Sequence, residues 1–143
     1  YTVDRLGGRN TRLDEMQAAF LRVRLPALHA RNDERVAVAN RLRSEIANPA
    51  LRFPTVRAGA VFHQCVALTE ARESLLRHLH QNGITAGIHY PLLDTTAAHP
   101  MEDLSASAAW CGQVVSLPCH GQLSDADVCH IIATCNRWEP ATS

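Results

Sequence analysis

A helical repeat of apolar residues runs through the first third of the chain, and Pro26 interrupts it. Before the proline, a three-then-four spacing joins Leu13, Met16, Phe20, Val23 and Ala27. Beyond it, the spacing resumes with Val36, Ala39, Leu42 or Arg43, and Ile46, and then meets Asn48-Pro49. Side chains at this spacing share one face of a helix, whereas proline lacks an amide proton and crowds the carbonyl four residues back. We therefore predict one long bent helix, or two abutting helices, within residues 1–48.

The start of this helix carries candidate N-cap residues. Asn10 or Thr11 can each turn a side-chain oxygen toward the free amide groups of a first helical turn. Thr11 and Asp14 are also three residues apart, which is a loose form of the capping box. The helix is therefore expected to begin directly after Asn10 or Thr11.

Three short strands are predicted in the rest of the chain. They lie at residues 60–69, which follow Gly59, and at residues 84–88 and 114–117. Each segment gathers apolar or β-branched residues between turn-forming residues, a pattern that favours strands. An irregular segment with a short helix is expected before the third strand.

Two further helices are predicted between and after these strands. A helix over residues 71–81 would bury Leu75, Leu76 and Leu79, and Asn82-Gly83 would stop it in the left-handed conformation. A final helix is capped by Ser124, with Asp127 three residues further on, as in a capping box. Its inner face comprises Val128, Ile131, Ile132 and Cys135.

This order of elements predicts an α+β (α/β) fold in which helices cover a small sheet. At 143 residues the chain fits a single domain, with the helical region at 1–48 and a sheet-and-helix region at 49–143. Its 14 basic and 14 acidic side chains balance, so no broad charge footprint points to nucleic acid or anionic lipid. The apolar runs are too short for a membrane span or a secretory leader, which favours a cytoplasmic location.

The five cysteines are scattered and odd in number: Cys65, Cys111, Cys119, Cys129 and Cys135. They lack the framework of a small disulfide-rich domain, so we expect them to be reduced and mostly buried. The pairs Cys119-His120 and Cys129-His130 raise zinc binding as an alternative. Structural zinc sites normally include closely spaced ligands such as CxxC or HxxxH, and neither is present. We therefore predict no metal site.

Five ordered motifs carry a family resemblance that extends from about Gly8 to Arg137. They are Gly-x-Asn-x-Arg-Leu-Asp-Glu-x-Gln-Ala-Ala at 8–19, Val-Phe-His at 61–63, Gly-Ile-x-x-x-Ile-His-Tyr-Pro at 83–91, Ser-Leu-Pro-Cys at 116–119 and Leu-Ser-Asp-Ala-Asp-Val at 123–128. In this order they resemble the C-terminal third of the DegT/DnrJ/StrS-type sugar-nucleotide aminotransferases. The resemblance implies the small C-terminal domain of the aspartate aminotransferase fold, with a long bent helix bridging to a large domain and a small, mostly antiparallel sheet covered by helices.

The resemblance also implies an activity and its requirements. Family members use pyridoxal phosphate, usually as homodimers with glutamate as amino donor, to convert a keto-sugar nucleotide into an amino-sugar nucleotide for polysaccharide or glycolipid biosynthesis. A lysine of the large domain holds the cofactor as a Schiff base and moves the proton. This chain has 14 arginines and no lysine. We therefore expect no transamination and no cofactor on this chain alone, and we expect a missing large domain, on the same or a separate chain, as its partner.

The resemblance assigns contact residues but no catalytic residue. Asn10 matches an asparagine that reaches the cofactor phosphate of a neighbouring subunit, and Arg12 matches the arginine beside it; a helix cap and a surface ion pair are the alternatives. His89 and Tyr90 match a segment near the substrate, and His63 matches a strand histidine. For these three residues, structural hydrogen bonding is the alternative.

Two departures from the family pattern leave the sugar open. Around residues 95–109 the family commonly carries a histidine or glutamine and an aromatic residue before the next helix, whereas this chain reads Thr-Thr-Ala-Ala-His-Pro at 95–100, and Arg9 replaces an aromatic residue. Three hypotheses follow. The chain is the C-terminal part of a split, truncated or excised aminotransferase; or a noncatalytic dimerisation or regulatory module derived from that family; or an unrelated small binding domain that uses its histidines and cysteines.

Overall fold

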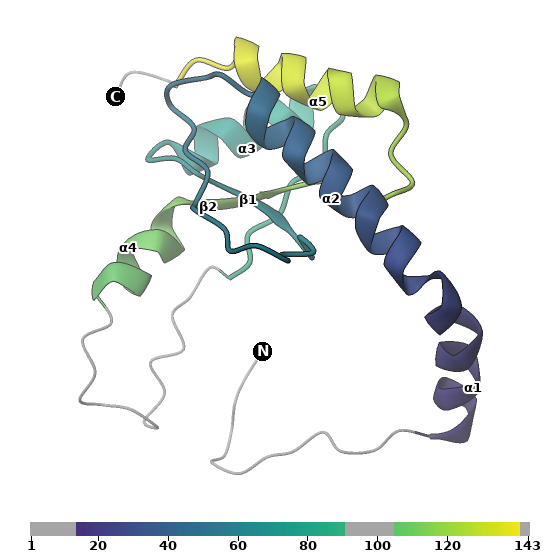
Figure 1. The fold of residues 1–143 in the computed structure, drawn as a ribbon. Helices are drawn as coiled ribbons and strands as arrows, with labels where there is room; N and C mark the ends of the chain where they lie inside the picture. Colours follow the sequence, from purple (N-terminus) through teal and green to yellow (C-terminus); the bar gives the residue numbers. More distant parts are fainter. Residues whose placement is uncertain (1–13, 91–104, 141–143) are drawn as a thin grey trace.

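The computed structural model describes residues 14–90 and 105–140 (Figure 1). Within these ranges the elements are α1 (Glu15–Arg24), η1 (Leu25–Ala27), α2 (Leu28–Glu45), β1 (Cys65–Leu68), α3 (Arg72–Gln81), α4 (Ser105–Gln113), β2 (Val114–Leu117) and α5 (Asp125–Arg137). Helices α2, α3 and α5 cover one face of the sheet that β1 and β2 form (Figure 1). The predicted α+β fold with a small antiparallel sheet is therefore confirmed. None of the helices in the described ranges has the length and apolar character needed to cross a membrane.

The long N-terminal helix is interrupted at Pro26, as the sequence predicts. The proline lies in η1, a single turn of 3-10 helix between α1 and α2. The cap differs from the expectation, because α1 begins at Glu15 and Asp14 accepts a hydrogen bond of 2.8 Å from the amide of Gln17. Asp14 is therefore the N-cap of this helix, and the predicted caps Asn10 and Thr11 lie outside the described residues.

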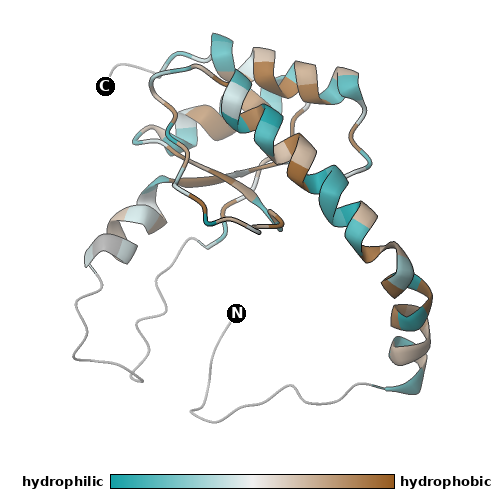
Figure 2. Cartoon of the chain, in the orientation of Figure 1, coloured by the Kyte–Doolittle hydropathy of each residue, from teal (hydrophilic) through white to brown (hydrophobic). Residues whose placement is uncertain are grey.

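The apolar stripe has two halves with different environments. In α2 the stripe is buried, through Ala39 and Leu42 and on to Ile46. In α1 no residue is buried, and Phe20 and Val23 are 66% and 80% exposed. Figure 2 shows apolar residues on α1, at the end of the long helical segment that lies away from the sheet. Only the second half of the predicted stripe therefore meets a core in the described residues.

The sheet is shorter than predicted. Strands β1 and β2 pair antiparallel from Cys65 opposite Leu117 to Leu68 opposite Val114. The strand predicted at 60–69 begins only at Cys65, because Phe62 has a φ of 48° in the left-handed region and cannot continue a strand. The strand predicted at 84–88 is reduced to a single bridge between Gly87 and Ser116.

The Arg43 guanidinium contacts the aromatic rings of both Phe53 and Phe62. The Arg43 guanidinium carbon lies 5.7 Å from the centroid of the Phe62 ring and 5.4 Å from that of Phe53. Its Nη2 also donates a hydrogen bond of 2.8 Å to the carbonyl of Pro54. This arrangement holds Phe62 against α2 and explains why the chain turns before it enters β1.

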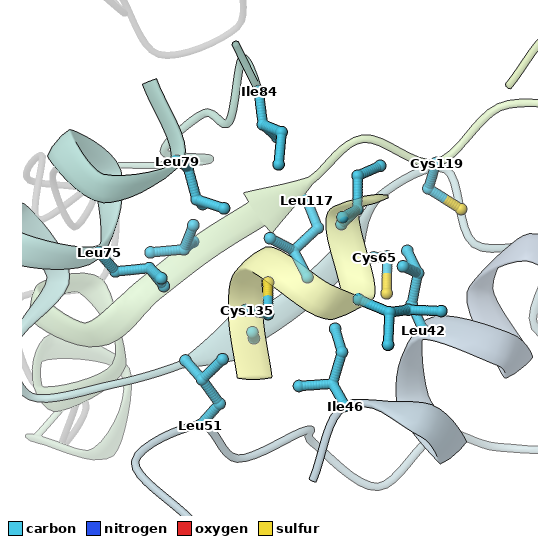
Figure 3. Packing of buried hydrophobic residues seen from close by; sticks show 14 of the residues in the cluster. Leu42, Ile46, Leu51, Cys65, Leu75, Leu79, Ile84, Leu117, Cys119 and Cys135 are labelled. Atoms are coloured by element: carbon cyan, nitrogen blue, oxygen red, sulfur yellow. The ribbon is translucent and has the colours of Figure 1, made fainter. Parts of the chain in front are cut away.

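The core fills the space between the sheet and helices α2, α3 and α5 (Figure 3). Alternate strand residues face it: Cys65, Ala67, Val115 and Leu117. All five cysteines are free thiols, of which Cys65, Cys119 and Cys135 are buried. Burial raises the pKa of Cys65 and of Cys135 to about 12, so both thiols stay protonated and pack as apolar groups.

Two asparagines join the C-terminal ends of α2 and α5. Asn48 donates from Nδ2 to the carbonyls of Cys135 at 2.8 Å and Trp138 at 2.7 Å, and its Oδ1 accepts from the amide of Ala50 at 2.9 Å. In return, Asn136 donates to the carbonyl of Glu45 at 3.0 Å and accepts from the amide of Ala47 at 2.8 Å. Helix ends leave carbonyl groups without intrahelical partners, and these two side chains supply partners for both ends.

Helix α5 begins with a local cap. Ser124 and Asp127 form the predicted capping box, in which the Asp127 carboxylate accepts from the Ser124 amide at 2.8 Å and hydroxyl at 2.7 Å. These hydrogen bonds from Ser124 lower the pKa of Asp127. The charged form of Asp127 therefore stabilises the folded chain.

Removing the Asn48 amide should destabilise the fold. We expect Asn48→Ala to lower the free energy of unfolding by about 2–3 kcal/mol, because three hydrogen bonds are lost and two buried carbonyls lose a donor. Urea denaturation measures the change. Asn40→Ala, on the exposed side of α2, is the control and should change stability by less than about 0.5 kcal/mol. Equal effects of the two substitutions would contradict this role for Asn48.

The capping box should give a pH-dependent contribution to stability. A carboxylate with a lower pKa in the folded state stabilises the fold above its unfolded pKa, here 3.8, and this contribution is lost as the pH falls through the folded pKa. Asp127→Asn should therefore be less stable than the unchanged chain at neutral pH, and the difference should shrink in acid below the unfolded value. Denaturant titrations at a series of pH values measure it. A difference that is constant over that series would refute the assignment.

Candidate functional site

The face of the sheet opposite the helices carries a fixed polar residue, Ser116. Its register partner is Val66 of β1, and its neighbours Val115 and Leu117 face the core, so its own side chain points to the opposite face. On the other side of β2, the Ser116 amide donates to the Gly87 carbonyl at 2.7 Å, and the Ser116 carbonyl accepts from the Gly87 amide at 3.0 Å. Backbone pairing on both sides thus fixes the position of the Ser116 hydroxyl.

Two side chains, those of Gln64 and His89, contact this hydroxyl. Ser116 Oγ donates a hydrogen bond of 3.1 Å to Oε1 of Gln64, which lies directly before β1. His89 Nδ1 lies 3.0 Å from the same Oγ. Ser116 is only 6% exposed, whereas the His89 ring is exposed. The arrangement therefore connects a buried anchor to a ring that can meet a ligand, and we call these three residues the His89 relay.

Gly87 makes room for the His89 ring. A Cβ atom at position 87 would lie 2.7 Å from His89 Cε1, closer than nonbonded carbon atoms approach in folded proteins. The ring therefore rests against the backbone two residues before it. This contact gives a physical reason for the glycine at position 87 of this chain.

The predicted site residues have different outcomes. His89 and Tyr90 lie together, with ring centroids 5.8 Å apart in an edge-to-face arrangement across a cis peptide bond, and Tyr90 is 61% exposed. His63 was predicted on a strand; it lies instead in a bend before β1, is exposed, and adjoins the relay through Gln64. Asn10 and Arg12 lie outside the described residues.

Sequence reasoning did not single out Gln64 and Ser116. Both positions carried a signal, because Gln64 follows the Val-Phe-His motif directly and Ser116 begins the Ser-Leu-Pro-Cys motif. Neither residue type is itself indicative of a site, and only the fold brings the two together. The structure therefore adds two polar residues to the predicted His-Tyr pair.

The sequence offers no residue of the type that carries pyridoxal phosphate covalently. The chain has no lysine, so no side chain can form a Schiff base with the cofactor. Across residues 14–90 and 105–140, no group of three or more His, Cys, Asp or Glu side chains is placed to hold a metal ion. Cys119 is hydrogen-bonded through its thiol to the carbonyl of Arg35 at 3.6 Å, and burial raises its pKa.

Filling the space above Gly87 should displace His89. We expect Gly87→Ala to break the hydrogen bond between His89 and Ser116, because the new methyl group occupies the position of the ring edge. The free energy of unfolding should change by less than about 1 kcal/mol, since the exposed ring can swing into solvent. The ¹H–¹³C signal of His89 Cε1 reports the displacement. Gly112→Ala is the matched control, because nothing lies within 4 Å of its Cβ position, and an unmoved His89 signal in Gly87→Ala would contradict the contact.

Comparisons with known proteins place the chain in a family. The pattern of the DegT/DnrJ/EryC1/StrS aminotransferase family matches residues 1–136. The chain is 34% identical over 141 residues to the erythromycin biosynthesis sensory transduction protein EryC1 of Saccharopolyspora erythraea, covering 92% of this chain and 38% of that protein. It is also 34% identical over 140 residues to dTDP-3-amino-3,4,6-trideoxy-alpha-D-glucose transaminase of Streptomyces venezuelae, covering 92% and 37%.

Solved structures agree with the sequence comparisons. The crystal structure of S. venezuelae DesV in complex with a ketimine intermediate has a TM-score of 0.81 and 33% identity, covering 92% of this chain and 38% of DesV. An aminotransferase from Brucella abortus has a TM-score of 0.77 and 29% identity, covering 90% of this chain and 36% of that chain. The chain therefore spans less than two fifths of the length of these relatives. It belongs to the DegT/DnrJ/EryC1/StrS aminotransferase family.

Proposed function

We propose that this chain is the C-terminal portion of a pyridoxal-phosphate-dependent sugar aminotransferase and works with a lysine-bearing large domain, on the same or a separate chain. The family match over residues 1–136 carries the proposal. The share of the relatives' length that the chain spans, 37–38%, is in keeping with a further domain. The absence of lysine assigns the cofactor-bearing amine to that domain.

The proposed reaction converts a keto-sugar nucleotide into an amino-sugar nucleotide for polysaccharide or glycolipid biosynthesis. The names of two relatives support this substrate class, since one specifies a dTDP-linked and the other a UDP-linked amino sugar. When bound in the complete enzyme, pyridoxal phosphate supplies the electron sink for amino transfer. In this proposal the lysine of the large domain moves the proton at the substrate carbon, since this chain has no lysine.

The chain's own residues bind and orient in this proposal. His89 and Tyr90 are exposed at the side of β2 that is bridged by Gly87, where hydroxyl groups of a sugar can hydrogen-bond to them. His63 adjoins them at the start of β1. Asn10 and Arg12 are proposed to contact the cofactor phosphate of a neighbouring subunit in a homodimer, where an arginine suits a phosphate because its planar group donates in pairs.

A noncatalytic dimerisation or regulatory module is the second candidate, and the apolar surface of α1 is in keeping with it. An open apolar depression runs along α1 and past η1 to the start of α2, lined by Ala18, Leu21, Leu25 and Leu28 with Arg22 and Arg24. An apolar patch of this kind normally meets another protein surface. A large domain would cover it in the first candidate, and a second copy of the chain would cover it in the second.

A chimera separates the two candidates. This chain replaces the matching 37% of the S. venezuelae transaminase, so that the upstream part of that enzyme supplies the lysine. We expect the chimera to bind pyridoxal phosphate and to transfer an amino group to a keto-sugar nucleotide. Borohydride reduction followed by intact-mass measurement should find cofactor on the chimera and none on this chain alone.

Controls make the chimera decisive. Replacing the lysine of the upstream part with arginine should abolish transfer without preventing folding. A folded chimera that binds the cofactor but transfers no amino group, together with a stable homodimer of this chain in light scattering, would favour the noncatalytic module.

A further inference from the structure

In the His89 relay, the Ser116 hydroxyl has one proton and two neighbouring atoms, Gln64 Oε1 and His89 Nδ1. Ser116 has a single hydrogen on Oγ, and it donates this hydrogen to Gln64 Oε1. The 3.0 Å contact between His89 Nδ1 and Ser116 Oγ then needs a proton from the histidine. The neutral His89 ring is therefore protonated on Nδ1, and its Nε2 atom carries a lone pair.

Two other histidines, His78 and His130, are held in the opposite tautomer, with the proton on Nε2. His78 Nε2 lies 3.1 Å from the Thr134 carbonyl oxygen, and His130 Nε2 lies 2.9 Å from the Asn82 carbonyl oxygen. A carbonyl oxygen can only accept a hydrogen bond, so the proton of each ring is on Nε2. These rings link α3 to α5, whereas His89 faces solvent. The tautomer of His89 is thus a property of its relay and is not shared by these two.

We infer that Gln64 and Ser116 are positioning residues that hold His89 with Nδ1 protonated, so that Nε2 accepts a hydrogen bond from a hydroxyl group of the bound ligand. Ser116 is fixed by backbone pairing on both sides, and its hydroxyl sets the direction of the His89 ring. Gly87 allows the ring to lie close to the backbone. Within the described residues, the structure records no hydrogen-bond partner for Nε2 of the exposed ring.

The tautomer of His89 determines which ligand groups its Nε2 atom can bind. An acceptor at Nε2 pairs with a hydroxyl, which donates, and does not pair with a keto oxygen, which only accepts. If the ligand is the keto-sugar nucleotide of the proposed function, His89 recognises one of its hydroxyl groups and leaves the keto group to the large domain. The ligand class rests on the proposed function, but the tautomer and the roles of Gln64 and Ser116 do not.

Long-range ¹H–¹⁵N correlation spectra of the full chain, labelled in histidine, test the relay directly. At a pH about two units above the ordinary histidine pKa of about 6.5, we expect the Nδ1–H pattern for His89 and the Nε2–H pattern for His78 and His130. His89→Gln identifies the His89 signal by its loss. An Nε2–H pattern for His89 in the unchanged chain would overturn the inference.

Three variants separate positioning from folding. Ser116→Ala and Gln64→Leu should each release the ring into exchange between both tautomers, whereas Gln64→Glu should retain the Nδ1–H pattern because a carboxylate also accepts. The unchanged signals of His78 and His130 show that each variant is folded. A retained Nδ1–H pattern in folded Gln64→Leu would overturn the role of Gln64, and the same result in Ser116→Ala would overturn that of Ser116.

Kinetics in the chimera then connect the relay to the ligand. Ser116→Ala should raise KM for the sugar nucleotide about tenfold with little change in kcat, because one hydrogen bond to the bound sugar is misdirected. Ser116→Thr keeps a hydroxyl and should restore KM. An unchanged KM in Ser116→Ala would refute the contact with the ligand. A chimera that transfers no amino group would refute the proposed function and would not alter the tautomer seen in the chain itself.

Discussion

The mutual capping of α2 and α5 by Asn48 and Asn136 is the constraint on which the rest of this domain depends. Apolar packing alone lets two helices slide along each other, whereas hydrogen bonds to their last carbonyls fix where both end. Asn48 also accepts from the amide of Ala50, which sets the course of the chain toward Arg52. Arg52 pairs with Leu68 of β1, so the same asparagine aligns the helices with the sheet.

The helix layer is closed by a second pair of reciprocal contacts, between α3 and α5. His78 of α3 bonds to the Thr134 carbonyl, and His130 of α5 bonds to the Asn82 carbonyl at the end of α3. The later position in α3 thus meets the earlier position in α5, so the two helices lie antiparallel on the sheet (Figure 1). These polar contacts lie in the helix layer on one side of the sheet, whereas the Ser116 side chain lies on the opposite face.

The features that the sequence predicts correctly are those with local causes. Pro26 interrupts a helix wherever it stands, Gly83 adopts a φ of 74° at the end of α3, and Ser124 with Asp127 caps α5 within one turn. The features that the sequence does not predict depend on contacts between residues that are far apart in the chain. Phe62 shortens β1 through a contact with Arg43, and the His89 relay joins residues 27 and 52 positions apart. No periodicity or spacing rule reports such pairs, so only the motif positions of Gln64 and Ser116 hinted at them.

The two single-residue bridges at the sides of the sheet also determine how this domain can meet another chain. Arg52 occupies the outer edge of β1 at Leu68, and Gly87 occupies the outer edge of β2 at Ser116. Each strand has only four residues, so in the described part of the chain little backbone is left for an incoming strand to extend the sheet. Extension of the sheet by another chain is therefore disfavoured at both edges, which protects the described part of the sheet from edge-to-edge aggregation.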